Sequence, residues 1–139
     1  MNTIVRGVIL LMFFPAFIAC SDKGGHEMDS SKEQIKTIFN KMEKETNWYP
    51  EKNDMLWGYF FTDKSKEKLG ALATKLQKEG YQLVEIRKDE VDDYYWLHLE
   101  RIEKHSVNSL HVRNKTLDNF AKNNNINSYD GWDVGPLKK

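Results

Sequence analysis

Apolar residues recur at helical spacing in three segments of the chain, and each segment predicts a helix. Ser31 and Gln34 form a capping-box pattern, so the first helix is expected to begin at Ser31 and to stop before Pro50. The second helix is expected over residues 65–80 and the third over residues 113–122. Their apolar faces consist of Ile35, Ile38, Phe39 and Met42; of Leu69, Leu72, Ala73 and Leu76; and of Leu117, Phe120 and Ala121.

Four other segments have the composition of β-strands. Residues 55–62 are rich in aromatic side chains, and residues 81–88 and 94–103 flank a short acidic connection that suits a hairpin. Residues 129–134 predict a turn that leads into a short strand. The third segment alternates between two faces: Tyr95, Leu97 and Leu99 on one, and Tyr94, Trp96, His98 and Glu100 on the other.

The order of these elements predicts the fold class. After the leading helix the chain runs strand, helix, strand, strand, helix, strand, which is the βαββαβ pattern of an α+β, ferredoxin-like sandwich with an extra N-terminal helix. Two helices can cover only one face of such a sheet. The opposite face, with Tyr94, Trp96 and His98 at its centre, is expected to meet solvent, the leading helix or a partner.

The first 19 residues have the features of a bacterial lipoprotein signal peptide. Residues 7–18 form an apolar run that is too short to cross a hydrocarbon core, which needs about 20 residues. The stretch from Phe17 to Ser21 resembles a lipobox, although Phe17 stands where that motif usually has Leu. Cleavage would leave Cys20 as the first residue and the site of lipidation. The alternative is a buried N-terminal helix with a cysteine in the core.

The expected lipid anchor predicts where the protein resides. Residues 20–30 are expected to form a tether and residues 31–139 the folded domain. Several acyl chains give stable membrane attachment where one chain does not. Ser21 resembles a sorting signal for the outer membrane, so the expected location is the cell envelope, lipid-anchored in the outer membrane and facing the periplasm.

Composition and charge exclude several classes of protein. The 139 residues include 8 Gly, 3 Pro and 1 Cys, which argues against collagen-like and disulfide-stapled folds. Lys and Arg number 21, as do Asp and Glu, so the chain lacks the excess positive charge typical of nucleic-acid-binding domains. The four histidines have no metal-ligand spacing, and phosphate-loop and nucleophile-elbow motifs are absent from the sequence. We therefore expect no enzyme activity, no cofactor and no metal.

The residues Tyr129-Asp130-Gly131-Trp132 resemble the C-terminal signature of the regulator of ribonuclease E activity B (RraB) family. Glu79-Gly80-Tyr81 after an amphipathic helix, and the helix just before the signature, strengthen the resemblance. It implies a ferredoxin-like fold and a small protein that binds another protein and restrains its activity without chemistry of its own. The chain differs from the acidic cytosolic members in being neutral and in ending with two lysines instead of an acidic tail.

Eight residues are expected to contact the unidentified protein partner, and each has a structural alternative. The acidic run at 89–93 would steer a basic partner or form a solvated hairpin tip, and His98 would contact the partner or be a partly exposed histidine. Asp130 would serve recognition or form a turn by bonding its own backbone, and Trp132 would belong to an interface or to the core. The eight residues are Asp92, Asp93, Tyr94, Trp96, His98, Asp130, Gly131 and Trp132.

Three functions remain open from the sequence. The first is a lipid-anchored, non-catalytic module that binds and restrains another protein of the envelope, for example in the manner of an immunity protein. The second is a cytosolic regulator of ribonuclease E with an unprocessed N-terminus, because an exported chain would not meet that enzyme. The third is an RNA-binding module with aromatic residues on an open sheet, which the missing Lys/Arg-Gly-Phe signature and the missing positive charge disfavour.

Overall fold

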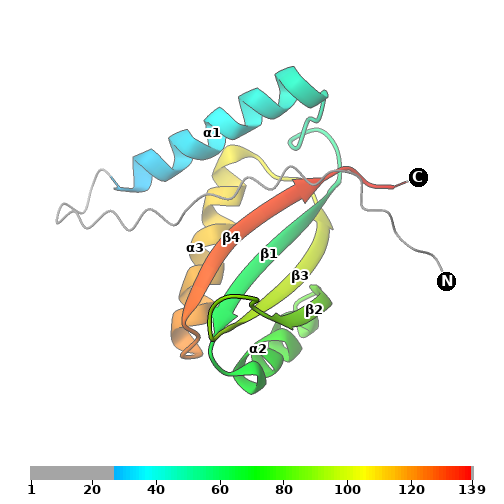
Figure 1. The fold of residues 1–139 in the computed structure, drawn as a ribbon. Coiled ribbons are helices and arrows are strands. Elements are labelled where there is room, and N and C mark those ends of the chain that lie inside the picture. Colours follow the sequence, from blue (N-terminus) through cyan, green and yellow to red (C-terminus); the bar gives the residue numbers. More distant parts are fainter. Residues whose placement is uncertain (1–26, 139) are drawn as a thin grey trace.

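The structure, a computed structural model, describes residues 27–138 of the chain, with side chains from Ser31 onward. The expected signal peptide and Cys20 lie outside the described residues. The elements, shown in Figure 1, are α1 (Glu27–Thr46), β1 (Met55–Asp63), α2 (Lys66–Lys78), β2 (Gln82–Lys88), β3 (Tyr95–Glu103), α3 (Val107–Asn123) and β4 (Ser128–Gly135).

The four strands form one antiparallel sheet in the order β2-β3-β1-β4, with α2 and α3 packed on the same face. This arrangement confirms the α+β, ferredoxin-like sandwich with an extra N-terminal helix. Strands β1, β2 and β3 agree with their expected ranges to within one residue at either end, and β4 also includes the residues that were expected to form a turn. Residues 89–94, which include the acidic run 89–93, connect β2 and β3, so the hairpin expected at this place is present.

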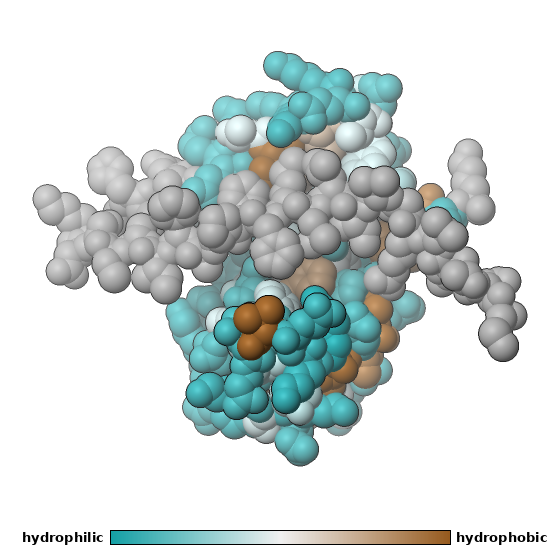
Figure 2. Space-filling view, viewed as in Figure 1, coloured by the Kyte–Doolittle hydropathy of each residue, from teal (hydrophilic) through white to brown (hydrophobic). Residues whose placement is uncertain are grey.

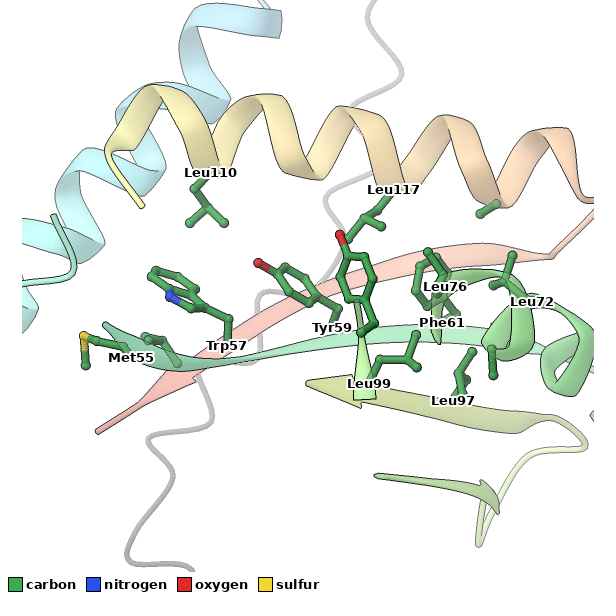
Figure 3. Packing of buried hydrophobic residues seen from close by; sticks show 14 of the residues in the cluster. Met55, Trp57, Tyr59, Phe61, Leu72, Leu76, Leu97, Leu99, Leu110 and Leu117 are labelled. Atoms are coloured by element: carbon green, nitrogen blue, oxygen red, sulfur yellow. The ribbon is translucent and has the colours of Figure 1, made fainter. Parts of the chain in front are cut away.

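The core lies between the sheet and its helices. Trp57, Tyr59 and Phe61 are fully buried, and they point from β1 toward the helical layer in Figure 3. Leu97 and Leu99 of β3 flank them, as the alternation in the sequence predicted, and leucines from α2 and α3 close the layer. Burial of each such side chain stabilises the fold by roughly 1.5–3 kcal/mol, so β1 is the main source of apolar burial in the sheet.

The leading helix packs on the helical layer. Helix α1 contacts α3, and its apolar face of Ile35, Ile38, Phe39 and Met42 is buried. The ring of Phe39 lies 6.2 Å from that of Trp57. The described part of α1 thus extends the core. Of the three expected neighbours of the opposite sheet face, it is therefore not α1 but solvent or a partner that remains.

Two helices begin earlier than expected, for identifiable reasons. Helix α3 begins at Val107 because Ser106 and Ser109 cap it reciprocally: each side-chain oxygen accepts from the other residue's backbone N–H, at 3.0 and 2.9 Å. Helix α1 begins at Glu27, within the expected tether, so the expected helix start at Ser31 is wrong. The Ser31 hydroxyl instead shares a hydrogen bond of 3.0 Å with Nδ1 of His111.

The turn expected at Asp130 is also wrong. Residues 128–135 form one continuous strand, and its register against β1 shifts between Phe60 and Phe61. The extra residue is Asp130, and Gly131 after it has φ of +110°. The Asp-Gly pair therefore forms a β-bulge, a feature that favours glycine for the same conformational reason as a turn does.

The Ser31–His111 contact joins α1 to α3 in a way that depends on pH. The His111 side chain is buried, and within the described residues its Nε2 atom has no hydrogen-bond partner. Burial lowers the pKa of His111 below 6.5, and the positive charges of Lys115 on α3 and Lys32 on α1 lower it further. Because the neutral ring is favoured in the folded state, this contribution to stability is present above pH about 6.5 and is lost as the pH falls toward the folded-state pKa.

We expect His111→Gln to make stability less dependent on pH. The amide can still bond Ser31 but does not titrate. Urea unfolding of the parent and the variant at pH 5 and pH 7.5 gives the comparison: the parent should lose more unfolding free energy on acidification than the variant. An equal loss in both proteins would contradict the assignment.

Candidate functional site

The strand register defines a sheet face opposite to α2 and α3, here called the outer face. Gly58 lies between Glu100 and Asp133, Phe60 between His98 and Gly131, and Thr62 between Trp96 and Ser128. Glu85 and Arg87 of β2 lie opposite His98 and Trp96 and extend the same face to the edge of the sheet. The outer face is thus built from residues of all four strands.

At one end of the outer face, Asp89 organises the hairpin. Its Oδ1 accepts a hydrogen bond of 2.9 Å from the indole N–H of Trp96, and its Oδ2 accepts from the backbone N–H groups of Val91 and Asp92 at 3.1 and 2.8 Å. The bond from the Asp92 N–H is the largest cause of a lowered pKa of Asp89, followed by the bond from Trp96. The acidic connection is therefore tied to the sheet through a tryptophan and is more than a solvated tip.

Tyr94 and Trp96 form an aromatic pair beside this carboxylate. Their ring centroids are 5.8 Å apart, and the guanidinium carbon of Arg87 lies 5.8 Å from the Trp96 ring centroid. Partial burial raises the pKa of Tyr94, and so do the negative charges of Asp89, Asp92 and Asp130. Because Asp130 belongs to β4, on the far side of β1, the charges that act on Tyr94 come from both β4 and the hairpin, at the same end of the outer face.

Asp130 is held by side chains of the outer face. The Ser128 hydroxyl donates to Asp130 Oδ1 at 2.8 Å, and it also lies 2.7 Å from the Thr62 hydroxyl. The expectation that Asp130 bonds its own backbone is therefore wrong. Within the described residues the second oxygen, Oδ2, is buried without a hydrogen-bond partner.

His98 occupies the centre of the outer face. Its ring stacks on Phe60 with centroids 4.5 Å apart, and its Nε2 lies 3.6 Å from a Glu100 oxygen. With 7% of its surface exposed, it is buried and is not the partly exposed histidine that the sequence suggested. A Cβ atom at Gly58 would lie 2.1 Å from Asp133 Oδ1 and 3.0 Å from His98 Nε2, so glycine is required for these groups to approach the strand.

Trp132 lies on the other side of the sheet from Tyr94 and Trp96. Its ring packs 5.5 Å from that of Trp57, and it is partly buried against the core. With Trp48, Val134 and residues of α1 it lines a small apolar pocket. The eight predicted residues are thus divided: seven lie on the outer face or its hairpin, and Trp132 faces the helical layer.

The helix-facing side of the sheet holds a separate polar cluster around Glu103. Its Oε2 accepts from the Tyr59 hydroxyl at 2.9 Å and from Arg113 at 2.8 Å, and Arg113 also donates to the Tyr81 hydroxyl at 2.8 Å. Burial opposes ionisation of Glu103, but the hydrogen bond with His105 and the charge of Arg113 outweigh it and lower its pKa. These groups satisfy one another, so the cluster fixes α3 on the sheet.

A metal-binding group and a membrane-spanning helix are both absent from residues 27–138. Those residues contain no group of three or more His, Cys, Asp or Glu side chains that could hold a metal ion. Among the helices they form, none is long and apolar enough to cross a membrane.

The comparisons with known proteins agree with this architecture. A family model described as "Regulator of ribonuclease activity B" matches residues 32–134. The chain belongs to the RraB family. The match includes all four strands, so the resemblance inferred from the Tyr129–Trp132 signature is confirmed. RraB proteins form a family of regulators, which makes this chain a regulatory protein-binding module in general class. No curated protein matches the chain.

Several outer-face residues were missed by the sequence analysis. Asp89 was noticed only as part of an acidic run, and Arg87 and Asp133 had no local motif. Gly58 carried a usable signal, because a glycine inside an aromatic strand often marks close approach of another group.

We expect Gly131→Ala to lower the stability of this RraB domain by about 1–3 kcal/mol, because alanine rarely adopts the positive φ that the bulge requires. Gly135→Ala is the matched control, since Gly135 lies in the same strand without a positive φ and with no atom within 4 Å of an added Cβ. Thermal and urea unfolding of both variants measure the difference. Equal stability of the two variants would show that the positive φ at position 131 does not strain alanine.

Proposed function

We propose that this RraB family protein is a lipid-anchored, non-catalytic module that binds another protein in the cell envelope and restrains its activity. The observation that carries the proposal is the Tyr94–Trp96 pair, which Asp89 holds at the hairpin end of the outer face. Aromatic side chains held in a fixed position supply much of the binding energy at protein interfaces. Membership of a family of regulators supports a binding role.

The envelope location is supported by the N-terminal sequence. The apolar run and the lipobox-like residues before Cys20 favour export and acylation. Ribonuclease E is cytoplasmic, so a protein exported in this way would regulate a different partner. An envelope enzyme or an incoming toxin, the latter bound as by an immunity protein, would meet this requirement.

The family match favours one alternative, a cytosolic regulator of ribonuclease E whose N-terminus is not processed. The RNA-binding alternative is disfavoured, because Asp89, Asp92 and Asp130 surround the aromatic pair and would repel phosphate groups.

We expect Trp96→Ala to weaken capture of the partner by more than about tenfold, because an interface would lose its central aromatic anchor. The partner is first defined as the protein enriched by the parent chain from detergent-solubilised envelope, and its affinity is then measured for each variant. Val112→Ala is the matched control for loss of an exposed apolar side chain, since Val112 is 53% exposed and lies on α3, away from the outer face. Circular dichroism checks that both variants fold. Equal affinity of the Trp96 variant and the parent would place the interface elsewhere.

We expect Cys20→Ser to move the protein from the membrane pellet to the soluble fraction, because serine cannot carry the thioether-linked lipid. Its circular dichroism spectrum should match that of the parent. Retention of the variant in the membrane pellet would contradict lipid anchoring at Cys20. A soluble parent of full length would instead favour the cytosolic alternative.

A further inference from the structure

Positive and negative side chains are equal in number in the whole chain, but the fold places an excess of each sign on a different layer. Residues 64–80 and 107–123, which contain α2 and α3, carry eight basic and three acidic side chains. Residues 82–104 and 128–135, which contain β2, β3, β4 and the hairpin, carry four basic and nine acidic side chains. The chain as a whole has 21 residues of each sign and is neutral. The layer formed by α2 and α3 is nevertheless positive, and the part of the sheet formed by β2, β3 and β4 is negative.

The negative charge of the sheet gathers on the outer face and its hairpin. Glu100 and Asp133 flank Gly58 in one row across three strands. The charges of Asp89, Asp92 and Asp130 all act on the Tyr94 hydroxyl. The exposed hairpin residues Glu90, Asp92 and Asp93 add to the same end.

Arg87 shows which chemical group suits this surface. Its guanidinium lies over the Trp96 ring, with the carbon 5.8 Å from the centroid, and its Nε is 3.7 Å from a Glu85 oxygen. An aromatic face with a carboxylate beside it is the combination that attracts a guanidinium. Tyr94 lies next to Trp96, with ring centroids 5.8 Å apart, and the Asp89 carboxylate, 2.9 Å from the Trp96 indole nitrogen, gives this pair the same combination.

Apolar side chains at both ends of the outer face add contact area. Val91 in the hairpin is 89% exposed, and Ile102 on β3 is 57% exposed. Figure 2 shows mainly hydrophilic residues near the β2–β3 connection, with a small hydrophobic patch among them. The alkyl stems of arginine and lysine can cover such isolated apolar groups while their charged ends meet carboxylates.

We propose that the outer face binds an arginine- and lysine-rich segment of the partner protein, with an arginine side chain stacked on Tyr94, beside the Trp96 ring that Arg87 covers, and paired with the surrounding carboxylates. The inference rests on the proposed function and specifies the chemistry of the partner. An anionic membrane or a nucleic acid would be repelled by the same carboxylates.

The test uses two synthetic peptides and the full-length chain in detergent. One peptide alternates arginine with serine, and the other alternates glutamate with serine. Fluorescence anisotropy at low salt should show binding of the arginine peptide alone, with an affinity that falls as salt is added. Neutralising the hairpin with Glu90→Gln, Asp92→Asn and Asp93→Asn should weaken that binding by about tenfold.

A matched triple variant separates the site from net charge. Glu33→Gln, Glu67→Gln and Glu79→Gln remove three exposed carboxylates from helical segments and should leave the affinity for the arginine peptide unchanged. Equal effects of the two triple variants would overturn the proposal, because binding would then follow net charge alone.

The natural partner distinguishes failure of this inference from failure of the proposed function. Hairpin neutralisation should weaken capture of the partner that the parent enriches from envelope extracts. If Trp96→Ala abolishes capture while the neutralised hairpin retains it, the proposed function holds and the cationic segment is refuted. If the parent enriches no partner at all, the proposed function itself fails.

Discussion

The pairing of β1 with β3 on one side and β4 on the other is the constraint on which the rest of the structure depends. Both edges of β1 are occupied, so its register cannot shift without breaking two ladders of backbone hydrogen bonds. A slip of one residue would turn Trp57, Tyr59 and Phe61 away from the helices. The same register places Gly58, Phe60 and Thr62 on the outer face. One strand therefore determines both the composition of the core and the surface available for binding.

The two sides of the sheet use polar groups in different ways. On the helix-facing side, Glu103, Arg113 and the Tyr59 hydroxyl bond one another within a partly buried cluster. Such a network stabilises one arrangement of α3 over its alternatives, because a displaced helix would leave buried groups without partners. On the outer face, Asp89 uses its hydrogen bonds to hold Trp96 and the hairpin. The hydrogen bonds of Asp89 therefore fix the position of surface side chains, whereas those of Glu103 fix a helix over the core.

Much of the fold was predictable from the sequence because the alternation of apolar and polar residues follows directly from strand geometry. Leu97 and Leu99 pointed to the core, and Trp96 and His98 to the opposite face, as the pattern indicated. The bulge at Asp130 was not predictable, because Asp-Gly favours turns and bulges through the same backbone freedom. The early start of α3 depends on two serines that cap each other, a weaker pattern than one with glutamate.

The site was predictable only in part, because it combines residues that are distant in the sequence. Tyr94 and Trp96 could be found from alternation within one strand. Their proximity to Asp130, and the place of Asp133 beside Gly58, depend on β4 crossing to the far side of β1. Trp132 was predicted to contact the partner because it belongs to the Tyr129–Trp132 signature. In β4, however, it lies opposite Tyr59, so its side chain points to the helical layer.

The separation of charge between helices and sheet has a mechanical consequence. A neutral body with opposite charge on two sides has a dipole moment, so a uniform electric field exerts a torque on it and no net pull. Over distances longer than about 8–10 Å the field is screened at physiological salt. During an encounter with a charged surface, this domain would therefore first rotate, and only at short range would one of its two sides be drawn into contact.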